Sequence, residues 1–383
     1  MALYVKKDRA GYLNLRAITT FVNDGPMEIE KAIELPEGGI ARVLSEEDIR
    51  KHLGIYHEGN WILVEYGGGI YFAFAGYLEE TSMGIIPPVH RSKLGPNVNK
   101  YNKEHERIIS SGCRYAHIQI GTPDEYEDTL HTIYLLESNQ DLRITIVRWR
   151  ANPTLDPVET AENWYQANKN LIHNLSPYWD RVWFEGVNEP PKDKIDWLNA
   201  FESERIRKAN SIGYKVSTYC WSVGGPSSDV YQASMGVLQW AQDTGHALSV
   251  HEYFGTQWDN WMYDGGGYLV GRINSNIQEP WWTAKFINVF VSETGADSVG
   301  VSGDASGWRY IMDADTYIWN LKKLDEYYNT IPNVLGIAGF LHGQQTPPDW
   351  DAFEWGEVPH NNKFVTSESI VDRVYDYISS VNQ

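Results

Sequence analysis

The sequence predicts an α/β chain in which a closed (β/α)8 barrel follows a small all-β domain. Three observations lead to this prediction. From Thr81 onward, eight apolar runs rich in β-branched and aromatic residues recur along the chain. Stretches with the 3.6-residue apolar period of a helix separate most of these runs. Residues 1–80 instead carry short β-like runs between glycine clusters. Eight strand–helix units fit a closed barrel of parallel strands better than an open sheet.

Residues 1–80 are expected to form a domain of their own, with the barrel domain at 81–383. In the first domain, apolar residues alternate with polar or small ones, which is the pattern of half-buried strands. The runs are Tyr12–Arg16, Trp61–Tyr66 and Ile70–Leu78. Their order resembles the bacterial SH3-like domain, apart from an insertion at Glu46–His57. The resemblance implies binding of cell-wall glycans, or a supporting role beside an enzyme.

The elements of the barrel follow in chain order. Its strands are expected at Gly84–Val89, Arg114–Ile120, Ile144–Trp149, Val182–Val187, Lys215–Trp221, Ala247–Phe254, Ile287–Ser292 and Val334–Leu341. Helices are expected between them at Thr122–Glu137, Val158–Leu175, Ile195–Ile212 and Ser228–Ala241. Asp193 and Ser227 stand where the N-cap residues of the last two helices belong.

Charge and composition narrow the range of partners. The 51 acidic residues outnumber the 32 basic ones, and the formal charge of −19 repels phosphate backbones and anionic membranes. No apolar run reaches the roughly 18 residues that a membrane span requires. The 16 tryptophans and 24 tyrosines favour a sugar, because aromatic rings pack against sugar C–H faces. We therefore predict a carbohydrate substrate, with neither nucleic acid nor membrane as a partner.

The cysteines and glycine runs indicate no cofactor. Cys113 and Cys220 lie inside or beside strand-like runs and are expected to be buried thiols rather than a disulfide. No His-Glu-x-x-His motif, cysteine pair or metal-spaced carboxylate cluster occurs, so no catalytic metal is predicted. The glycine run at 265–267 is not followed by Lys-Ser or Lys-Thr, as a phosphate loop would be.

Two of the predicted strands end in a carboxylate. The fourth runs into Glu189-Pro190, and the seventh runs into Glu293, followed by Gly295. Catalytic groups of a (β/α)8 barrel collect at the carboxyl ends of its strands, where strands four and seven face each other across the mouth. Hydrolysis of a glycoside with retention needs two carboxyl groups about 5–5.5 Å apart. The two glutamates are expected to form such a pair.

Three short segments, on strands four, six and seven, are Glu185–Pro190, Leu248–Tyr253 and Val289–Gly295. They resemble the large barrel clan of retaining glycosidases that contains cellulases, mannanases and xylanases. The resemblance implies that Glu189 is the acid/base and Glu293 the nucleophile, with Glu189 titrating above the roughly 4.3 of a free glutamate. It also implies that Asn188 holds the sugar 2-hydroxyl, that Tyr253 hydrogen-bonds the nucleophile, and that His251 lines the cleft.

The sequence departs from the clan at two positions. The clan usually carries an arginine near the end of strand two, whereas the best candidates here are Arg148 and Arg150 on strand three. Either could pair with Glu293 and keep it ionised, or belong to a surface ion pair. Where the clan carries a tryptophan at the end of strand eight, this chain offers His342 or Gln344 as a contact to the sugar.

Aromatic side chains after the strands are further candidates for sugar contact, with a structural role as the alternative. The longest connection, from Phe254 to about Glu279, carries Trp258, Trp261, Tyr263 and Tyr268. The other candidates are Trp221, Trp308, Trp350 and Trp355.

The sequence thus predicts a retaining glycoside hydrolase that cleaves β-glycosidic bonds of a poly- or oligosaccharide by double displacement. The alternative is a non-catalytic carbohydrate- or cell-wall-binding protein on the same fold, against which the presence of both glutamates argues. An aldolase or isomerase would need a strand-end lysine or a phosphate-binding loop, and neither is seen. We expect a secreted or extracellular protein, although Met1–Lys7 carry no signal-peptide core and a cytoplasmic location stays open.

Overall fold

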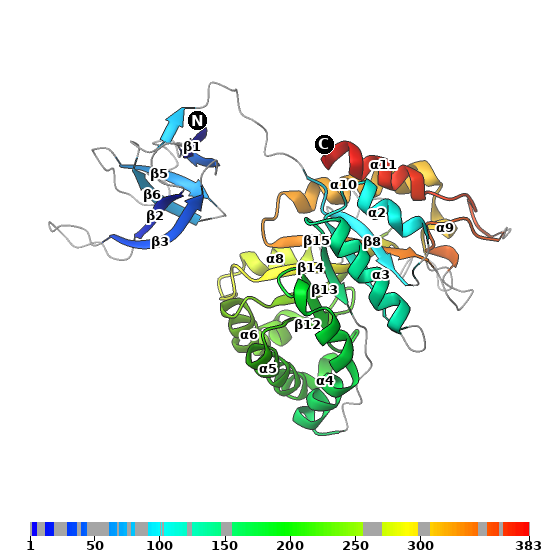
Figure 1. The fold of residues 1–383 in the computed structure, drawn as a ribbon, viewed down its shortest axis with the longest axis horizontal. Helices are drawn as coiled ribbons and strands as arrows, with labels where there is room; N and C mark the ends of the chain where they lie inside the picture. The colour runs from blue at the N-terminus through cyan, green and yellow to red at the C-terminus, as the bar shows by residue number, and fades with distance from the viewer. Residues whose placement is uncertain are drawn as a thin grey trace. The chain divides into compact units, whose positions relative to one another are not determined.

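The computed structural model of the protein divides the chain into two compact units, Met1–Val89 and His90–Gln383 (Figure 1). In the first unit the structure describes the backbone of seven strands. In the second it describes residues 91–99, 101, 103–120, 125–146, 155–255, 270–297, 307–343, 351–359 and 363–382.

The described part of the first unit is a single sheet with the strand order β3-β2-β6-β5-β4-β1-β7. The pairings between its strands are antiparallel. The first two predicted runs correspond to β2 and β5, and the third, Ile70–Leu78, covers most of β6 and reaches the first residue of β7. The SH3-like resemblance stays a prediction. The strands are β1 (Ala2–Val5), β2 (Tyr12–Ile18), β3 (Ile29–Pro36), β4 (Ile40–Val43), β5 (Trp61–Tyr66), β6 (Gly69–Phe74) and β7 (Leu78–Glu80).

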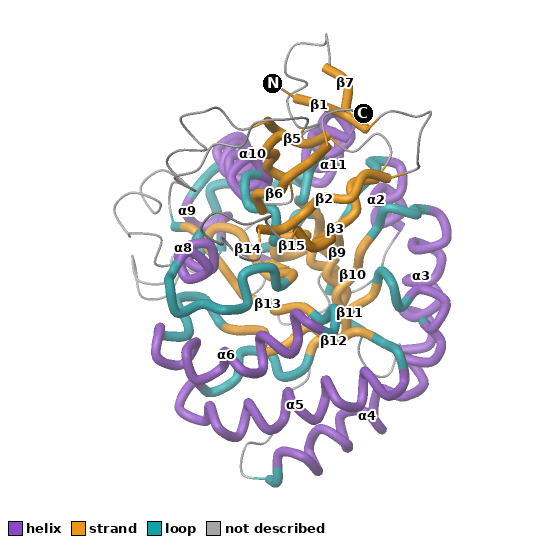
Figure 2. Tube along the Cα trace, turned by 90° about the vertical axis from the view of Figure 1, so that its left-hand side faces the viewer, coloured by secondary structure: helices purple, strands orange, loops and turns teal. Residues whose placement is uncertain are grey.

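The second unit is a closed barrel of eight parallel strands in the order β10-β11-β12-β13-β14-β15-β8-β9. The predicted (β/α)8 architecture is therefore confirmed. Figure 2 shows helices on the outside of this ring of strands. The strands are β8 (Leu94–Val98), β9 (Tyr115–Ile118), β10 (Arg143–Ile146), β11 (Val182–Glu185), β12 (Lys215–Trp221), β13 (Ala247–Phe254), β14 (Asn288–Ala296) and β15 (Val334–His342).

The first barrel strand is β8, so the prediction of this strand at Gly84–Val89, which lies outside the described residues, is wrong. The reason is that Leu94–Val98 contains a glycine and a proline, which indicate a turn when they are read in isolation. In the barrel the glycine is required by close packing. A Cβ atom on Gly95 would lie 1.7 Å from the carbonyl oxygen of Tyr115 on the neighbouring strand.

The four predicted helices correspond to α3, α4, α5 and α6, with bounds that agree to within a few residues. Ser227 occupies the predicted N-cap position of α6, but Asp193 lies within a short 3-10 helix, and Lys194 is the N-cap residue of α5. The prediction of an Asp193 cap is therefore wrong. The helices are α2 (Glu106–Ser110), α3 (Glu125–Ser138), α4 (Pro157–Asn174), α5 (Ile195–Ile212), α6 (Ser228–Asp243), α8 (Arg272–Gln278), α9 (Trp308–Ile311), α10 (Ala314–Asn329) and α11 (Val371–Asn382).

The inside of the barrel is filled in layers. Its lower layer is apolar and consists of Tyr115, Trp183, Ala247, Phe290 and Ala338. Two residues further along β9, β11 and β13, the buried positions become polar and are occupied by His117, Glu185 and Ser249. The two-residue period of a strand places both sets on the same face. A polar layer therefore lies between an apolar plug and the carboxyl ends of the strands.

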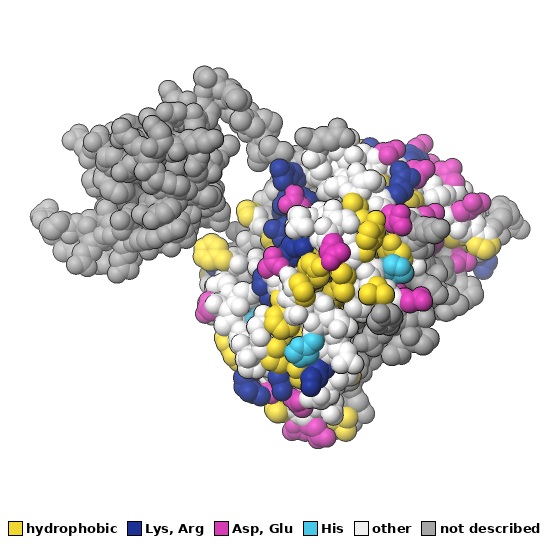
Figure 3. Space-filling model, in the orientation of Figure 1, with side chains coloured by type: hydrophobic (Ala, Val, Ile, Leu, Met, Phe, Trp, Pro, Cys, Tyr) yellow, Lys and Arg dark blue, Asp and Glu magenta, His cyan; other side chains and the backbone are white. Residues whose placement is uncertain are grey.

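The described surface of the second unit carries mixed charges. On the face shown in Figure 3, acidic and basic side chains are interspersed with hydrophobic ones. Leu130 and Tyr134 of α3 are each 47% exposed, which is ordinary for single surface hydrophobics. None of the helices in the described part of the chain combines the length and apolarity needed to cross a bilayer.

Candidate active site

Glu189 follows β11, at the carboxyl end of the fourth barrel strand. Its φ angle of 48° lies in the left-handed region, which residues other than glycine adopt mainly where surrounding contacts impose it. One such contact is the hydrogen bond that its backbone N–H donates to the carbonyl oxygen of Cys220, at 3.0 Å. The side chain of Glu189 is 46% exposed, so its carboxylate is accessible to solvent.

Glu293 lies within β14, and its side chain is only 7% exposed. The hydroxyl of Tyr253 donates a hydrogen bond of 2.8 Å to its Oε2 atom. The parallel register of β13 and β14 pairs His251 with Glu293 and Tyr253 with Gly295, beyond a register shift. Tyr253 therefore comes from the neighbouring strand, and its contact is the one that the family resemblance implied.

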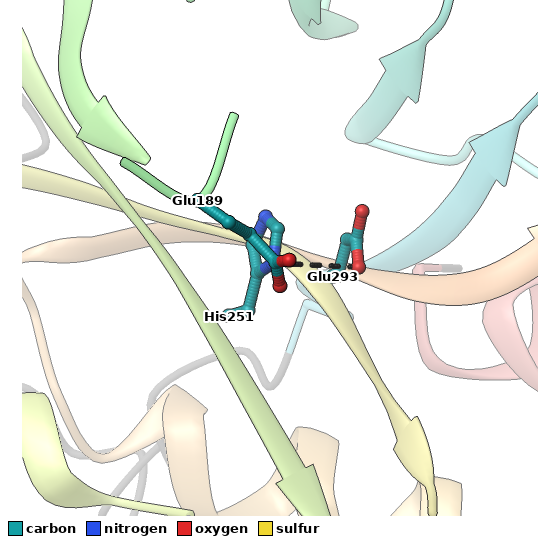
Figure 4. Close-up of side chains that lie close together, drawn as sticks. All are labelled: Glu189, His251 and Glu293. Atoms are coloured by element: carbon teal, nitrogen blue, oxygen red, sulfur yellow. Dashed lines mark hydrogen bonds and ion pairs between the residues drawn. The ribbon is translucent and has the colours of Figure 1, made fainter. Parts of the chain in front are cut away.

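His251 joins the two glutamates. Its buried Nδ1 atom lies 3.0 Å from Oε1 of Glu189 and 3.4 Å from Oε2 of Glu293. Figure 4 shows the three side chains converging from three different segments of the barrel. One side-chain atom from each residue lies within 4.8 Å of the others. A single imidazole nitrogen is thus shared by an exposed and a buried carboxylate.

The same three residues have the donor types with which a protein holds Zn²⁺. The nitrogen that would bind an ion is the one that lies between the two carboxylates, and it is within hydrogen-bond distance of Oε1 of Glu189. Tyr253 also donates to the Glu293 oxygen that faces His251. The three side chains are therefore close enough to share protons.

A third carboxylate, Glu185, lies beneath this cluster and was not singled out from the sequence. It is buried, and its Oε1 atom accepts a hydrogen bond of 2.7 Å from the hydroxyl of Ser249. Nδ1 of His117 lies 3.7 Å from the same oxygen and 2.8 Å from the hydroxyl of Thr145. The sequence did hold a signal for Glu185. Residues two apart on a strand share a face, so counting back from Glu189 in steps of two places Glu185 inside the barrel.

The structure corrects two predicted sugar contacts. Trp221 and Trp308 are completely buried. The Trp221 ring stacks on Tyr219 at a centroid distance of 5.0 Å, and the Trp308 ring stacks on Tyr317 at 4.7 Å. Both therefore belong to the core, where they pack among other aromatic side chains. Trp355, a further candidate for sugar contact, is also fully buried.

His342 at the end of β15 is likewise buried, which contradicts its predicted contact with the sugar. Its Nδ1 atom lies 3.2 Å from Oε1 of Glu354, and its Nε2 atom lies 3.6 Å from Oε2 of Glu104. The ring of His105 approaches it edge-on at 4.5 Å. These neighbours surround the imidazole, and the pairing with Glu354 could not be read from the sequence.

Asn188, one of the predicted contacts, is partly exposed beside Glu189, and its Oδ1 atom lies 3.5 Å from the sulfur of Cys220. Cys113 and Cys220 are both buried thiols, as predicted. The other predicted contacts, Arg148 and Trp258, lie outside the described residues. So do Arg150, Trp261, Tyr263, Tyr268, Gln344 and Trp350.

Neither a protein-family model nor a curated sequence matches this chain. Among solved structures, it is similar to BuGH86 in complex with neoagarooctaose, with 11% identity and a TM-score of 0.46 over 75% of this chain. It is also similar to a GH5 cellulase from an Icelandic hot spring isolate, with 16% identity and a TM-score of 0.41 over 84% of this chain and 94% of the cellulase. A GH39 β-xylosidase from Caulobacter crescentus has 11% identity and a TM-score of 0.42, over 76% of this chain and 71% of the xylosidase.

The chain spans 61% of the BuGH86 chain and 60% of a tri-modular GH5 endo-β-1,4-glucanase from Bacillus licheniformis. The activities in these names belong to those proteins. The barrel assignment of this chain rests on its own strand pairing.

Proposed function

We propose that this chain is a retaining glycoside hydrolase in which Glu189 is the acid/base and Glu293 is the nucleophile. The observation that carries the proposal is that one oxygen of each lies within 4.8 Å of the other, with Nδ1 of His251 beside them. Carboxyl groups of retaining enzymes are about 5–5.5 Å apart, whereas inverting enzymes hold them about 6.5–9.5 Å apart to admit a water molecule. The distance between the nearest oxygens is compatible with the retaining geometry.

The surroundings of the two glutamates support different roles. Glu189 is 46% exposed, so the water that it activates in the second step can reach it. Glu293 is 7% exposed, and the hydrogen bond from Tyr253 stabilises a negative charge on it. A protonated Glu189 beside an ionised Glu293 is the starting state that double displacement requires.

In the first step, Glu189 gives its proton to the leaving oxygen while an oxygen of Glu293 attacks the anomeric carbon. The glycosidic C–O bond breaks, an alcohol leaves, and a glycosyl ester forms on Glu293. In the second step, the ionised Glu189 takes a proton from water, whose oxygen attacks the anomeric carbon and frees Glu293. In this proposal Asn188, next to Glu189, holds the sugar 2-hydroxyl.

The proposed substrate is a β-linked poly- or oligosaccharide met outside the cell, with no cofactor. We also propose that the first unit binds cell-wall glycans, on the SH3-like pattern of its sequence. Both proposals rest on residue patterns and on the aromatic content of the chain. A pull-down of the full-length protein on insoluble cell-wall glycan, with and without competing soluble oligosaccharide, tests the second proposal.

The catalytic proposal is tested by hydrolysis of a panel of aryl β-glycosides and polysaccharides. Glu189→Gln and Glu293→Gln should each abolish release of sugar from unactivated substrates, while Glu279→Gln, at an exposed position, should leave release unchanged. ¹H NMR of the first product should show the anomer of the substrate. Mass spectrometry should find a 2-fluorosugar ester on Glu293.

Three outcomes would count against the catalytic proposal. Initial formation of the opposite anomer would indicate inversion and remove the nucleophile role of Glu293. Hydrolysis that survives Glu293→Gln would place the reaction elsewhere. Absence of both turnover and labelling, together with measurable binding of oligosaccharides, would favour the non-catalytic carbohydrate-binding protein.

A further inference from the structure

The fifth barrel strand, β12, contains an irregularity directly beneath Glu189. Its register with β13 shifts between Thr218 and Trp221. The two residues in the shift, Tyr219 and Cys220, have φ angles of 67° and 46°, in the left-handed region that non-glycine residues rarely adopt. Bulges of this kind re-aim a side chain and are frequent beside active sites. Cys220 is the side chain that this bulge turns toward the site.

Helix α5 holds the bulge in place. The backbone N–H of Tyr219 donates to Oε1 of Glu202 at 3.1 Å, and its hydroxyl donates to Oδ1 of Asn199 at 2.7 Å. Glu202 is itself paired with Arg205 at 2.6 Å, and Arg205 donates to the carbonyl oxygen of Phe184 at 2.7 Å. The buried ion pair thus fixes the ends of β11 and β12 relative to each other.

Cys220 contacts both halves of the candidate site. Its carbonyl oxygen accepts the hydrogen bond from the N–H of Glu189 at 3.0 Å. Its buried sulfur lies 3.2 Å from Nε2 of His251, on the side of the ring opposite the two glutamates. The same sulfur lies 3.5 Å from Oδ1 of Asn188 and 3.5 Å from Oε2 of Glu185. One residue therefore touches the backbone of the acid/base and the imidazole beside it.

The groups around His251 determine where its proton resides. Nδ1 faces oxygen atoms of Glu189 and Glu293, so it carries a hydrogen. Nε2 faces the thiol of Cys220, which can donate its S–H hydrogen to that nitrogen. Loss of the thiol proton would add a further negative charge to a buried site that already holds Glu185 and Glu293. A neutral ring with its hydrogen on Nδ1 donates toward the carboxylates and accepts from the thiol at the shortest of the thiol's contacts, 3.2 Å, against 3.5 Å to Glu185 and Asn188.

We propose that Cys220 is a positioning residue that holds His251 in the neutral Nδ1–H tautomer through its thiol and holds the backbone of Glu189 through its carbonyl oxygen. The tautomer stands on the geometry alone, whereas its consequence for catalysis rests on the proposed glycosidase function. An imidazolium ion 3.0 Å from Glu189 would favour an ionised carboxylate there. The neutral ring lets Glu189 keep the proton that the leaving oxygen requires.

The tautomer is tested by long-range ¹H–¹⁵N NMR of the histidine rings in the full-length protein, with the His251 signals assigned from a His251→Gln spectrum. Wild type should show a protonated Nδ1 and an unprotonated Nε2. Cys220→Ser should keep this pattern, because a hydroxyl also donates. Cys220→Ala should protonate Nε2 as well, because no donor then faces that nitrogen and the carboxylates beside Nδ1 favour an imidazolium ion. Cys113→Ala, which removes the other buried thiol, is the matched control and should leave the His251 signals unchanged.

A wild-type ring with its hydrogen on Nε2, or an unchanged His251 spectrum in Cys220→Ala, would overturn the proposal whether or not the protein hydrolyses glycosides. Conversely, a correct tautomer in a protein without hydrolytic activity would contradict only the proposed function. If Cys220→Ala does not fold, the wild-type and Cys220→Ser spectra still decide the tautomer.

Kinetics then separate positioning from mere structural support. Cys220→Ala should lower kcat by about tenfold, the value of one hydrogen bond, on glycosides whose leaving group needs a proton. It should lower kcat much less on 2,4-dinitrophenyl glycosides, which leave without one. KM should stay unchanged, and Cys220→Ser should restore most of the loss. An equal loss of kcat on both kinds of substrate would indicate that Cys220 only packs against the site.

Discussion

Replacing Glu252 by glutamine is expected to remove a pH-dependent part of the stability of the barrel. Glu252 lies between His251 and Tyr253 on β13 but points to the opposite side of the strand. Its buried carboxylate accepts hydrogen bonds from the N–H groups of Gly271 and Ile273 and from the hydroxyl of Tyr328. It thereby joins the sixth barrel strand to the start of α8.

Burial raises the pKa of Glu252 from the ordinary value of 4.5 to about 7, although hydrogen bonds from Tyr328 and the two backbone groups oppose the shift. The folded protein therefore binds this proton more tightly than the unfolded chain does. The resulting stabilisation is complete below about pH 4.5 and is lost as the pH rises through about 7. With one pKa unit worth about 1.4 kcal/mol, the free energy of unfolding should fall by about 3 kcal/mol across this window.

Urea denaturation followed by tryptophan fluorescence, at several pH values from 5 to 8, would measure this loss. The quantity to compare is the difference in unfolding free energy between wild type and Glu252→Gln. Burial lowers the pKa of His246 to about 4, so this histidine makes the stability of both proteins rise with pH, and the difference removes its contribution. Glu279→Gln, at an exposed position beyond α8, is the control and should follow wild type. Parallel stability curves for wild type and Glu252→Gln would refute the reasoning.

Three further predictions concern the site and its support. Tyr253→Phe removes a hydrogen bond to the carboxylate of Glu293 and should lower kcat/KM on an aryl glycoside about 10- to 100-fold. An unchanged kcat/KM would contradict the role of the hydroxyl. Gly186→Ala would place a Cβ atom 2.3 Å from Nη1 of the buried Arg205 and should lower the free energy of unfolding by about 2 kcal/mol. An unchanged midpoint of urea denaturation would contradict this prediction. On an activated aryl glycoside that the variant still hydrolyses, Glu189→Gln should abolish the basic limb of the pH profile of kcat/KM, because that limb reports ionisation of the acid. A limb that persists would belong to another group.

The repeating pattern of the barrel could be read from the sequence because every strand–helix unit buries the same kind of face. The predicted range of α5, Ile195–Ile212, is identical to the observed one. The strand β8 could not be found in this way, since its glycine and proline are typical of a turn and the glycine is required by contact with a neighbouring strand. That contact exists only in the closed barrel.

The aromatic residues illustrate the same limit. The sequence places Trp221 and Trp308 near the ends of barrel strands, but it does not state which way a ring turns. In the structure both rings are fully buried, stacked on Tyr219 and Tyr317. The bulge in β12 rotates the residues beside it, and such a register shift leaves no periodic trace in the sequence.

The sequence by itself determined that this chain builds alternating strands and helices and that two strands end in Glu189 and Glu293. These features are local, because they depend on periodicity and on where each apolar run stops. Only the tertiary structure decided that one nitrogen of His251 would lie between the two carboxylates and that Cys220 would lie behind it. Those contacts join residues 31 to 62 positions apart in the chain, and they arise because closing the barrel brings the ends of separate strands together.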